Sequence, residues 1–413
     1  MVQTDDRLSI SQGLSFCSLQ EPEARPRAYK TMALASFVLL AGANIPTPLY
    51  QVYRQLFNFS EFTITIIFGV YSLAVIPALL FFGPLGDTIC RRRALLIALS
   101  IETIGVGFMA AAQSVLWLLA GRMIIGLAIG AAQGNTAAAL VEMQPRGDIR
   151  MAGVATMTSA IGGAATGPLL SGLVGQYLPK PLLLSYLIEF ALLGIVLISV
   201  AAIPERNRSF SLSSIKIHRP RIPGKNKLAF TVATISGGLM FSIAGIFLAL
   251  VPSYVSDLLH AQNLAAGGIV VAITMGSSVA GQLILRKLSS SYLQLIGLGS
   301  SILGLLATVL AWPFSSLILM FAGAVLCGAG SGIGALGSIA DLNDLAPAEE
   351  RGGVTSLYFA LVYLFFSLPS AGLGFTAGYI GLYPAVRLFA AAIAFLSLAC
   401  MVWFIFRRRI SAY

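Results

Sequence analysis

The basic residues of this chain fall into alternate gaps between about twelve long apolar runs. Of its 26 Lys and Arg residues, 22 lie in the two tails or in every second gap, while the intervening gaps hold only Arg54, Lys180 and Arg387. Short loops rich in Lys and Arg stay on the cytoplasmic side of a membrane. The pattern therefore predicts a multi-pass protein of a bacterial inner membrane with both termini in the cytoplasm.

The composition supports a membrane protein. Hydrophobic residues make up 57% of the chain and charged residues 10%, too few to cover the apolar surface of a soluble domain. The net charge of +10 would suggest nucleic acid as a partner of a soluble chain. Here the cations lie beside the ends of predicted spans, so topology and anionic lipids account for them. We expect the lipid bilayer, and no nucleic acid, as a partner.

Each apolar run is near the roughly 20 residues that a helix needs to cross the hydrocarbon core, where only helices satisfy their own backbone groups. The first run is not expected to be a cleaved signal peptide, because its removal would leave eleven spans and reverse every later loop. The predicted spans are 31–51, 62–82, 93–112, 114–141, 152–176, 182–203, 229–252, 264–285, 292–311, 315–339, 354–377 and 383–406.

The spans divide into two sets of six. Pro204 to Lys227 is the largest hydrophilic interruption, and it is rich in Ser, Pro and Gly, as flexible linkers are. The two sets share glycines and prolines at an offset of about 200 residues, for example Pro168 with Pro369. Such repeats are typical of secondary transporters. The predicted units are a tail (1–29), an N-terminal six-helix bundle (30–203), a linker (204–228), a C-terminal six-helix bundle (229–406) and a second tail (407–413).

Residues 83–93 have the sequence GPLGDTICRRR, which resembles the pattern G-x-L-x-D-R-x-G-R-[RK] of the major facilitator superfamily. The resemblance covers nearly everything after residue 30 and is strongest to the 12-span drug or metabolite:proton antiporters. It implies an all-α polytopic membrane protein with twelve transmembrane helices in two pseudo-symmetric six-helix halves.

In that family the loop forms a latch between the halves, which would involve Gly83, Asp87, Arg91 and Arg92. The loop departs from the pattern at Thr88 and Cys90, which leaves open whether it still acts as a latch. The alternative is that the arginines only set the topology.

Arg122 lies about 12 Å below the outer end of the fourth span. An Arg at such a depth costs at least about 2.5 kcal/mol, so we expect it to face a polar cavity or an acidic partner. Glu102 in the third span and Glu189 in the sixth are the candidate acids. The setting of Arg122 resembles a family motif associated with proton or substrate coupling, a role we extend to both acids. The alternatives are snorkelling of Arg122 to the outer headgroups and a purely structural ion pair or hydrogen bond of the acids.

The fifth span contains Gly163, Gly167, Pro168 and Gly172 in an arrangement similar to G-x-x-x-G-P-x-x-G-G, which the family associates with antiporters. A Pro inside a helix removes a backbone hydrogen bond and bends the helix. The pattern favours export by antiport, although a kink that serves only packing is the alternative.

Helices one, four, seven and ten line the cavity in this family, which gives a set of polar residues on these helices and their neighbours as cavity candidates. They are Asn44, Tyr71, Gln133, Ser242, Gln282, Tyr358 and Tyr363. Phe, Met and small residues dominate the rest of the predicted lining, which suits amphipathic or apolar solutes.

The sequence contains no Walker-type phosphate loop, no metal-ligand cluster and no Ser/His/Asp set. We therefore expect no enzyme activity, metal or cofactor, and transport driven by an ion gradient, with protons as the expected ion. The first hypothesis is a monomeric secondary active transporter that exports a drug-like or small amphipathic metabolite by alternating access. The alternative is proton-coupled uptake of a sugar or organic acid. A third hypothesis, a polytopic membrane enzyme or sensor, lacks any evident catalytic group.

Overall fold

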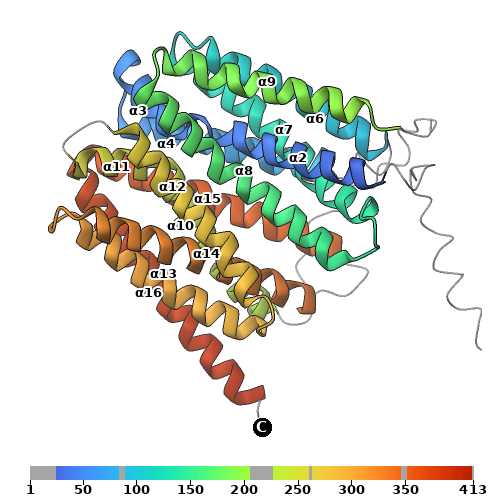
Figure 1. The fold of residues 1–413 in the computed structure, drawn as a ribbon. Helices are drawn as coiled ribbons and strands as arrows, with labels where there is room; N and C mark the ends of the chain where they lie inside the picture. Colours follow the sequence, from blue (N-terminus) through green and yellow to red (C-terminus); the bar gives the residue numbers. More distant parts are fainter. Residues whose placement is uncertain (1–24, 83–88, 205–226, 260–262, 346–350, 412–413) are drawn as a thin grey trace, which may run out of the picture.

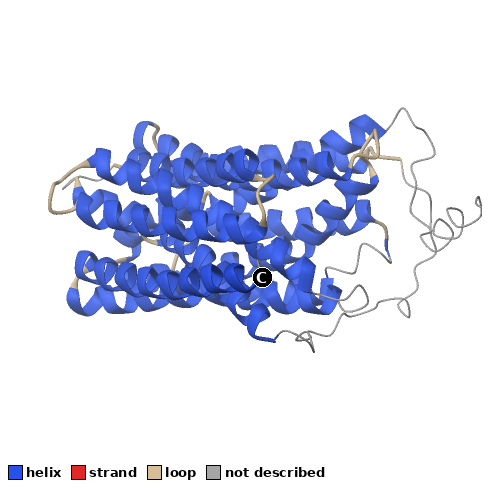
Figure 2. Ribbon diagram, turned by 90° about the horizontal axis from the view of Figure 1, so that it is seen from below, coloured by secondary structure: helices blue, strands red, loops and turns tan. Residues whose placement is uncertain are grey.

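The computed structural model describes residues 25–82, 89–204, 227–259, 263–345 and 351–411. In these segments the chain forms long helices joined by short loops, and no strand is present (Figure 2). Most of the predicted first tail and of the predicted linker lies outside the described residues.

The N-terminal half contains the helices α2 (Arg25–Asn44), α3 (Pro46–Phe57), α4 (Glu61–Phe82), α6 (Arg91–Ala110), α7 (Val115–Glu142), α8 (Ile149–Tyr177) and α9 (Pro181–Ala201). The C-terminal half contains α10 (Lys227–Ala249), α11 (Val251–Leu258), α12 (Leu264–Leu285), α13 (Ser290–Ala311), α14 (Leu317–Leu345), α15 (Arg351–Ile380) and α16 (Leu382–Ser411). Two pairs, α2 with α3 and α10 with α11, each correspond to one predicted span.

Eleven helices of the described chain, counting α2 with α3 as one, are long and apolar enough to cross a membrane. The helix α8 has 29 residues and completes the predicted set of twelve. It is rich in Gly, Thr and Ser, which lowers its hydropathy. The protein is therefore a multi-pass membrane protein, as predicted from the apolar runs.

The first span of each half is interrupted at a proline-containing segment. α2 ends at Asn44 and α3 begins at Pro46, and in the other half α10 ends at Ala249 and α11 begins at Val251, directly before Pro252. A Pro cannot donate the backbone hydrogen bond that a continuous helix requires. The two interruptions occupy equivalent places in the two halves, which agrees with the repeat in the sequence.

The two halves lie side by side and touch mainly through two pairs of helices (Figure 1). α8 packs against α12, and α4 packs against α15. One cluster of buried apolar side chains runs through both halves. We call the side of the protein that holds residue 25 and Ser411 the terminal side, and the opposite side, where α3 ends and α4 begins, the distal side.

A buried charged site at the end of the first span

Arg122 is buried inside the N-terminal half, with an exposed fraction of 1%. It lies seven residues, or about 10 Å, from the distal end of α7. Its Nη1 donates a hydrogen bond to the carbonyl oxygen of Ala43, and its Nε has no partner among the described residues. The guanidinium also lies over the ring of Tyr71, with 4.5 Å from Cζ to the ring centroid. Arg122 is therefore held by a neutral carbonyl and an aromatic face.

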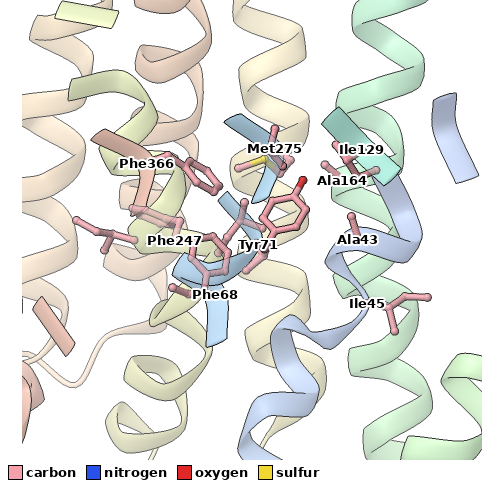
Figure 3. Close-up of a cluster of buried hydrophobic side chains, with 14 of the residues drawn as sticks. Ala43, Ile45, Phe68, Tyr71, Ile129, Ala164, Phe247, Met275 and Phe366 are labelled. Atoms are coloured by element: carbon pink, nitrogen blue, oxygen red, sulfur yellow. The ribbon is translucent and has the colours of Figure 1, made fainter. Parts of the chain in front are cut away.

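The sequence around Ala43 explains why the helix α2 ends at this point. In a continuous helix the carbonyls of Gly42 and Asn44 would accept from the residues four positions later. Those residues are Pro46 and Pro48, which have no N–H. Arg122 reaches this end of α2, where a cation is favoured by the free carbonyls and the helix dipole. Figure 3 shows the irregular backbone at Ala43 and Ile45.

Glu102 of α6 and Glu189 of α9 are both fully buried and meet at Gly42 of α2. A Cβ placed on Gly42 would come within 2.5 Å of Glu189 Oε1 and 2.8 Å of Glu102 Oε1. The two oxygens are therefore no further apart than the sum of these two distances. None of the four carboxyl oxygens has a hydrogen-bond partner in the described part of the chain. Two carboxyl groups this close in a nonpolar setting cannot both carry a charge at low cost. We call Glu102 and Glu189 the carboxyl pair.

Arg122 and the carboxyl pair lie at nearly the same depth but do not bond to one another. Glu102 is eight residues from the distal end of α6 and Glu189 is eight residues into α9, or about 12 Å in each case. The ion pair that the sequence suggested as one possibility is not formed here. Instead, adjacent residues of α2 contact the two groups: Gly42 contacts the acids and Ala43 binds the arginine.

Glycine in α7 allows Tyr71 to reach its place beneath Arg122. A Cβ on Gly126 would lie 2.4 Å from the carbonyl oxygen of Tyr71, so only glycine lets α4 come this close to α7. Phe68 and Tyr50 complete the aromatic surroundings of the guanidinium, at 5.7 and 6.0 Å. The close packing of α4 on α7 at Gly126 thus positions an aromatic ring at the charge.

Three of the predicted cavity residues gather where the halves meet. The hydroxyl of Tyr363 donates to Gln133 Oε1 at 2.9 Å, which joins α15 to α7. Phe68 of α4 lies 5.1 Å from Phe366 of α15, ring centroid to centroid. Figure 3 shows Tyr71 close to Phe68 and beside Met275 of the other half. We call this region the central aromatic region. It consists of the rings of Phe68, Tyr71, Tyr363 and Phe366, the thioether of Met275 and the amide of Gln133.

The other four cavity candidates bond within their own half. Ser242 donates to the carbonyl of Phe365 at 2.7 Å, and Tyr358 bonds to Ser338 at 2.9 Å. The side-chain nitrogens of Asn44 and Gln282 lie 2.8 and 3.4 Å from acceptors one turn earlier in their own helices. Whether any of the seven candidates contacts substrate stays a prediction.

The predicted kink in α8 is a place of very close backbone packing. Cβ atoms on Gly163 and Gly167 would come within 2.0 and 2.2 Å of carbonyl oxygens of α2. On the side of α8 that faces α12, a Cβ on Gly268 would lie 2.4 Å from the carbonyl oxygen of Pro168, so glycine leaves room for that oxygen. Gly172 of α8 packs on Leu264 of α12. The motif thus packs α8 between α2 and the opposite half.

The predicted latch is only partly visible. Gly83 and Asp87 lie outside the described residues. Arg91 donates from Nε to Glu142 at 3.1 Å and from Nη1 to Asn135 at 3.2 Å. Arg92 donates from Nε to the carbonyl of Val200 at the end of α9, at 3.2 Å. These two arginines therefore tie α6 to its neighbours within the N-terminal half, and the latch function itself stays a prediction.

A polar cluster that the sequence did not suggest joins the halves on the distal side. Gln51 and Arg54 of α3 donate to Ser253 and Glu61, respectively. Ser253 of α11 in turn donates to Glu61 Oε2 at 3.1 Å. Nearby, Gln176 of α8 accepts from the backbone of the first turn of α12 at 3.0 Å. We call Gln51, Arg54, Glu61 and Ser253 the distal cluster.

A bundle of two similar helical halves, with a charged site buried inside one half, is an architecture found in membrane transporters. The family model of the Major Facilitator Superfamily matches residues 32–368. The chain belongs to this family, and it is a transporter rather than an enzyme.

Solved transporters have a similar fold. The nucleoside transporter NupG is 14% identical, with a TM-score of 0.71 over 92% of this chain and 99% of that chain. A bacterial homologue of the human lysosomal transporter Spinster, in an inward-facing and occupied conformation, is 13% identical, with a TM-score of 0.68 over 94% of this chain and 98% of that chain. No curated protein matches the sequence significantly. At these identities the likeness extends to the fold alone.

Proposed function

We propose that the protein is a proton-coupled exporter that moves drug-like or small amphipathic molecules by alternating access. It works as a monomer in a bacterial inner membrane, with its terminal side in the cytoplasm. The observation that carries the proposal is the carboxyl pair, two fully buried acids with no hydrogen-bond partner among the described residues.

A buried acid without a cation partner is suited to carrying a proton. Intramembrane acids mark ion and proton pathways because an unpaired charge there is costly. Binding a proton removes that cost and releasing one restores it, so the occupancy of the pair changes the energy of the surrounding helices. The proton gradient can therefore act on the protein through Glu102 and Glu189.

The positions of the contacts between the halves support a rocking mechanism. The distal cluster, the contact of Gln176 with α12 and the packing of Gly172 on Leu264 all lie on the distal side. Closure on one side is what alternating access requires of a carrier that binds solute from the other side. With the terminal side cytoplasmic, the described conformation has its extracytoplasmic side closed.

The central aromatic region supports an amphipathic substrate. Aromatic faces and a thioether favour flat or apolar groups, and the bonded Gln133 and Tyr363 offer polar atoms at one edge. The antiporter-like motif of α8 favours export. A specific observation favours the alternative of organic acid symport: Arg122 has an unpartnered Nε that a substrate carboxylate could accept from.

Inverted membrane vesicles with a pH-sensitive dye test the proposal. Lipophilic cations, antibiotics, sugars and organic acids are added to energised vesicles that contain the protein. We expect an amphipathic compound to trigger proton release, and the response to disappear in the double variant Glu102→Gln/Glu189→Gln. Glu142→Gln is the control, because that carboxylate is already paired with Arg91.

Two results would count against the proposal. Proton release that persists in the double variant would exclude the carboxyl pair as the coupling site. Proton movement that only sugars or organic acids drive, in right-side-out vesicles, would replace export with symport.

A further inference from the structure

We infer, on the basis of the proposed proton coupling, that the carboxyl pair controls the distal closure through the interruption of the first span at Ile45. With a proton on the pair, Arg122 stays on the carbonyl of Ala43 and the distal side is closed. When the proton leaves, Arg122 moves to the carboxylates, α3 is released and the distal side opens.

The first step of the argument is that one turn of α2 touches both charged groups. Gly42 is in contact with the carboxyl pair, and the next residue, Ala43, accepts the hydrogen bond of Arg122. A change in the charge of the pair therefore acts within one residue of the bond that holds the arginine.

The second step is that the bond to Ala43 is open to competition. A guanidinium has five N–H donors, yet Arg122 uses one of them on a neutral carbonyl, and its Nε has no partner in the described part of the chain. A carboxylate is a stronger acceptor for Arg than a carbonyl and can bind two N–H groups at once. An ionised carboxyl pair at the same depth is thus a better partner than Ala43.

The groups around the pair leave the two acids as the part that titrates. Besides Arg122, which stays charged, the titratable side chains facing this region are the tyrosines of α3, α4 and α9, whose hydroxyls are neutral near neutral pH. They are Tyr50, Tyr53, Tyr71 and Tyr186. Glu102 and Glu189 therefore set the local charge.

The third step is that the interruption at Ile45 connects this turn to the distal cluster. Pro46 and Pro48 remove two backbone hydrogen bonds, so the joint between α2 and α3 is held by fewer bonds than a continuous helix. One backbone hydrogen bond that remains at the joint runs from Ile45 N to the carbonyl of Ala41, at 2.9 Å. Beyond the joint, α3 carries Gln51 and Arg54, the two residues of α3 that belong to the distal cluster.

The direction of this device agrees with antiport. A proton taken up from the distal side neutralises the pair, restores the bond of Arg122 to Ala43 and closes that side. Release of the proton to the terminal side leaves the pair ionised, and the carrier then opens distally again with solute bound. The proton thus binds at the carboxyl pair, between α2, α6 and α9, while the solute binds between the two halves.

A cysteine reporter in the distal closure tests the inference. Ser256, three residues after Ser253 in α11, is outside the distal cluster and has an exposed fraction of 9% in the closed state, so Ser256→Cys in a chain without its four native cysteines should react slowly with a membrane-impermeant maleimide added from the distal side. We expect labelling to rise several-fold between low and high pH. In Glu102→Gln/Glu189→Gln, labelling should stay at its low-pH level throughout.

Arg122→Gln should give the opposite result, with high labelling at every pH, because nothing then holds Ala43. Unfolding would raise labelling, so it cannot explain low labelling in the double Gln variant, and thermal unfolding of Arg122→Gln shows whether its high labelling comes from folded protein. Gly42→Ala should shift the midpoint of the pH response, since its Cβ would meet the carboxyl groups, whereas Gly194→Ala on α9 has no neighbour within 4 Å and should not.

A pH response that survives in the double Gln variant would overturn the inference. A pH-independent reporter in the native chain, while vesicles still show solute-driven proton movement, would overturn it as well and leave the proposed function standing. Absence of any proton movement in the vesicles would instead reject the proposed function.

Discussion

Arg122 and Ala43 are joined by a hydrogen bond from the guanidinium to a main-chain carbonyl, so a charged side chain of α7 binds the C-terminal end of α2. Ala43 has no side-chain feature that would mark it as a partner. Its role arises from its place at the end of α2, where Pro46 and Pro48 leave the carbonyls of Gly42 and Asn44 on either side of it without helical N–H donors. The interruption of the first span and the binding of the buried arginine are therefore one structural feature.

Tyr71 should stabilise Arg122 through its ring. A buried cation over an aromatic face gains about 2 kcal/mol, and Cζ lies 4.5 Å from the ring centroid. We expect Tyr71→Leu to lower the free energy of unfolding by about 2 kcal/mol more than Tyr71→Phe, which keeps the ring. Thermal or denaturant unfolding of the purified protein measures the difference. Equal losses in the two variants would show that the ring does not hold the guanidinium.

The helices and the division into halves could be predicted from the sequence because they depend on local composition. The span predicted at 264–285 matches α12 (Leu264–Leu285). Apolar runs of this length must be helical in a bilayer, which leaves little freedom. The first and seventh spans instead continue through their prolines to Phe57 and Leu258, since short helices resume after each break.

The packing of α8 on α12 should depend on a single glycine. A Cβ on Gly268 would lie 2.4 Å from the backbone oxygen of Pro168, and backbone cannot move aside cheaply. We expect Gly268→Ala to reduce transport by at least about tenfold, because separating the helices costs more than the 1.4 kcal/mol that a tenfold change represents. Gly276→Ala on the same helix is the control, because a Cβ there has no neighbour within 4 Å. Similar transport rates in the two variants would contradict this prediction.

The residues of the charged site were partly predictable. Arg122, Glu102 and Glu189 stand out as charges within apolar runs, and the structure places them close to one turn of α2. The contact of Gly42 with both acids could not be predicted from the sequence, because it depends on how α2, α6 and α9 pack against one another. The distal cluster was also missed, since Gln51 and Ser253 lie more than 200 residues apart and are ordinary polar residues near span ends.

Arg91 and Glu142 should be energetically coupled within the N-terminal half. Their side chains are 14% and 18% exposed, so the ion pair is mostly shielded from water, and Arg91 has Asn135 as a further acceptor. In a double-mutant cycle of Arg91→Met and Glu142→Gln, we expect a coupling of about 1 kcal/mol in the free energy of unfolding. A value near zero would mean that Arg91 acts only as a positive charge that sets the membrane topology.

The distal cluster should hold α3 against α11 and α4. Glu61 accepts from Arg54 and from Ser253, and its side chain is 11% exposed. Glu61→Gln removes the charge that strengthens both bonds but keeps an acceptor in place. Because Arg54 is 37% exposed, we expect a loss of only about 1 kcal/mol, which is roughly fivefold faster hydrogen exchange of the α3 and α11 amides. Lys180→Ala, at another distal loop, is the control, and equal exchange in the two variants would show that Glu61 does not hold the closure.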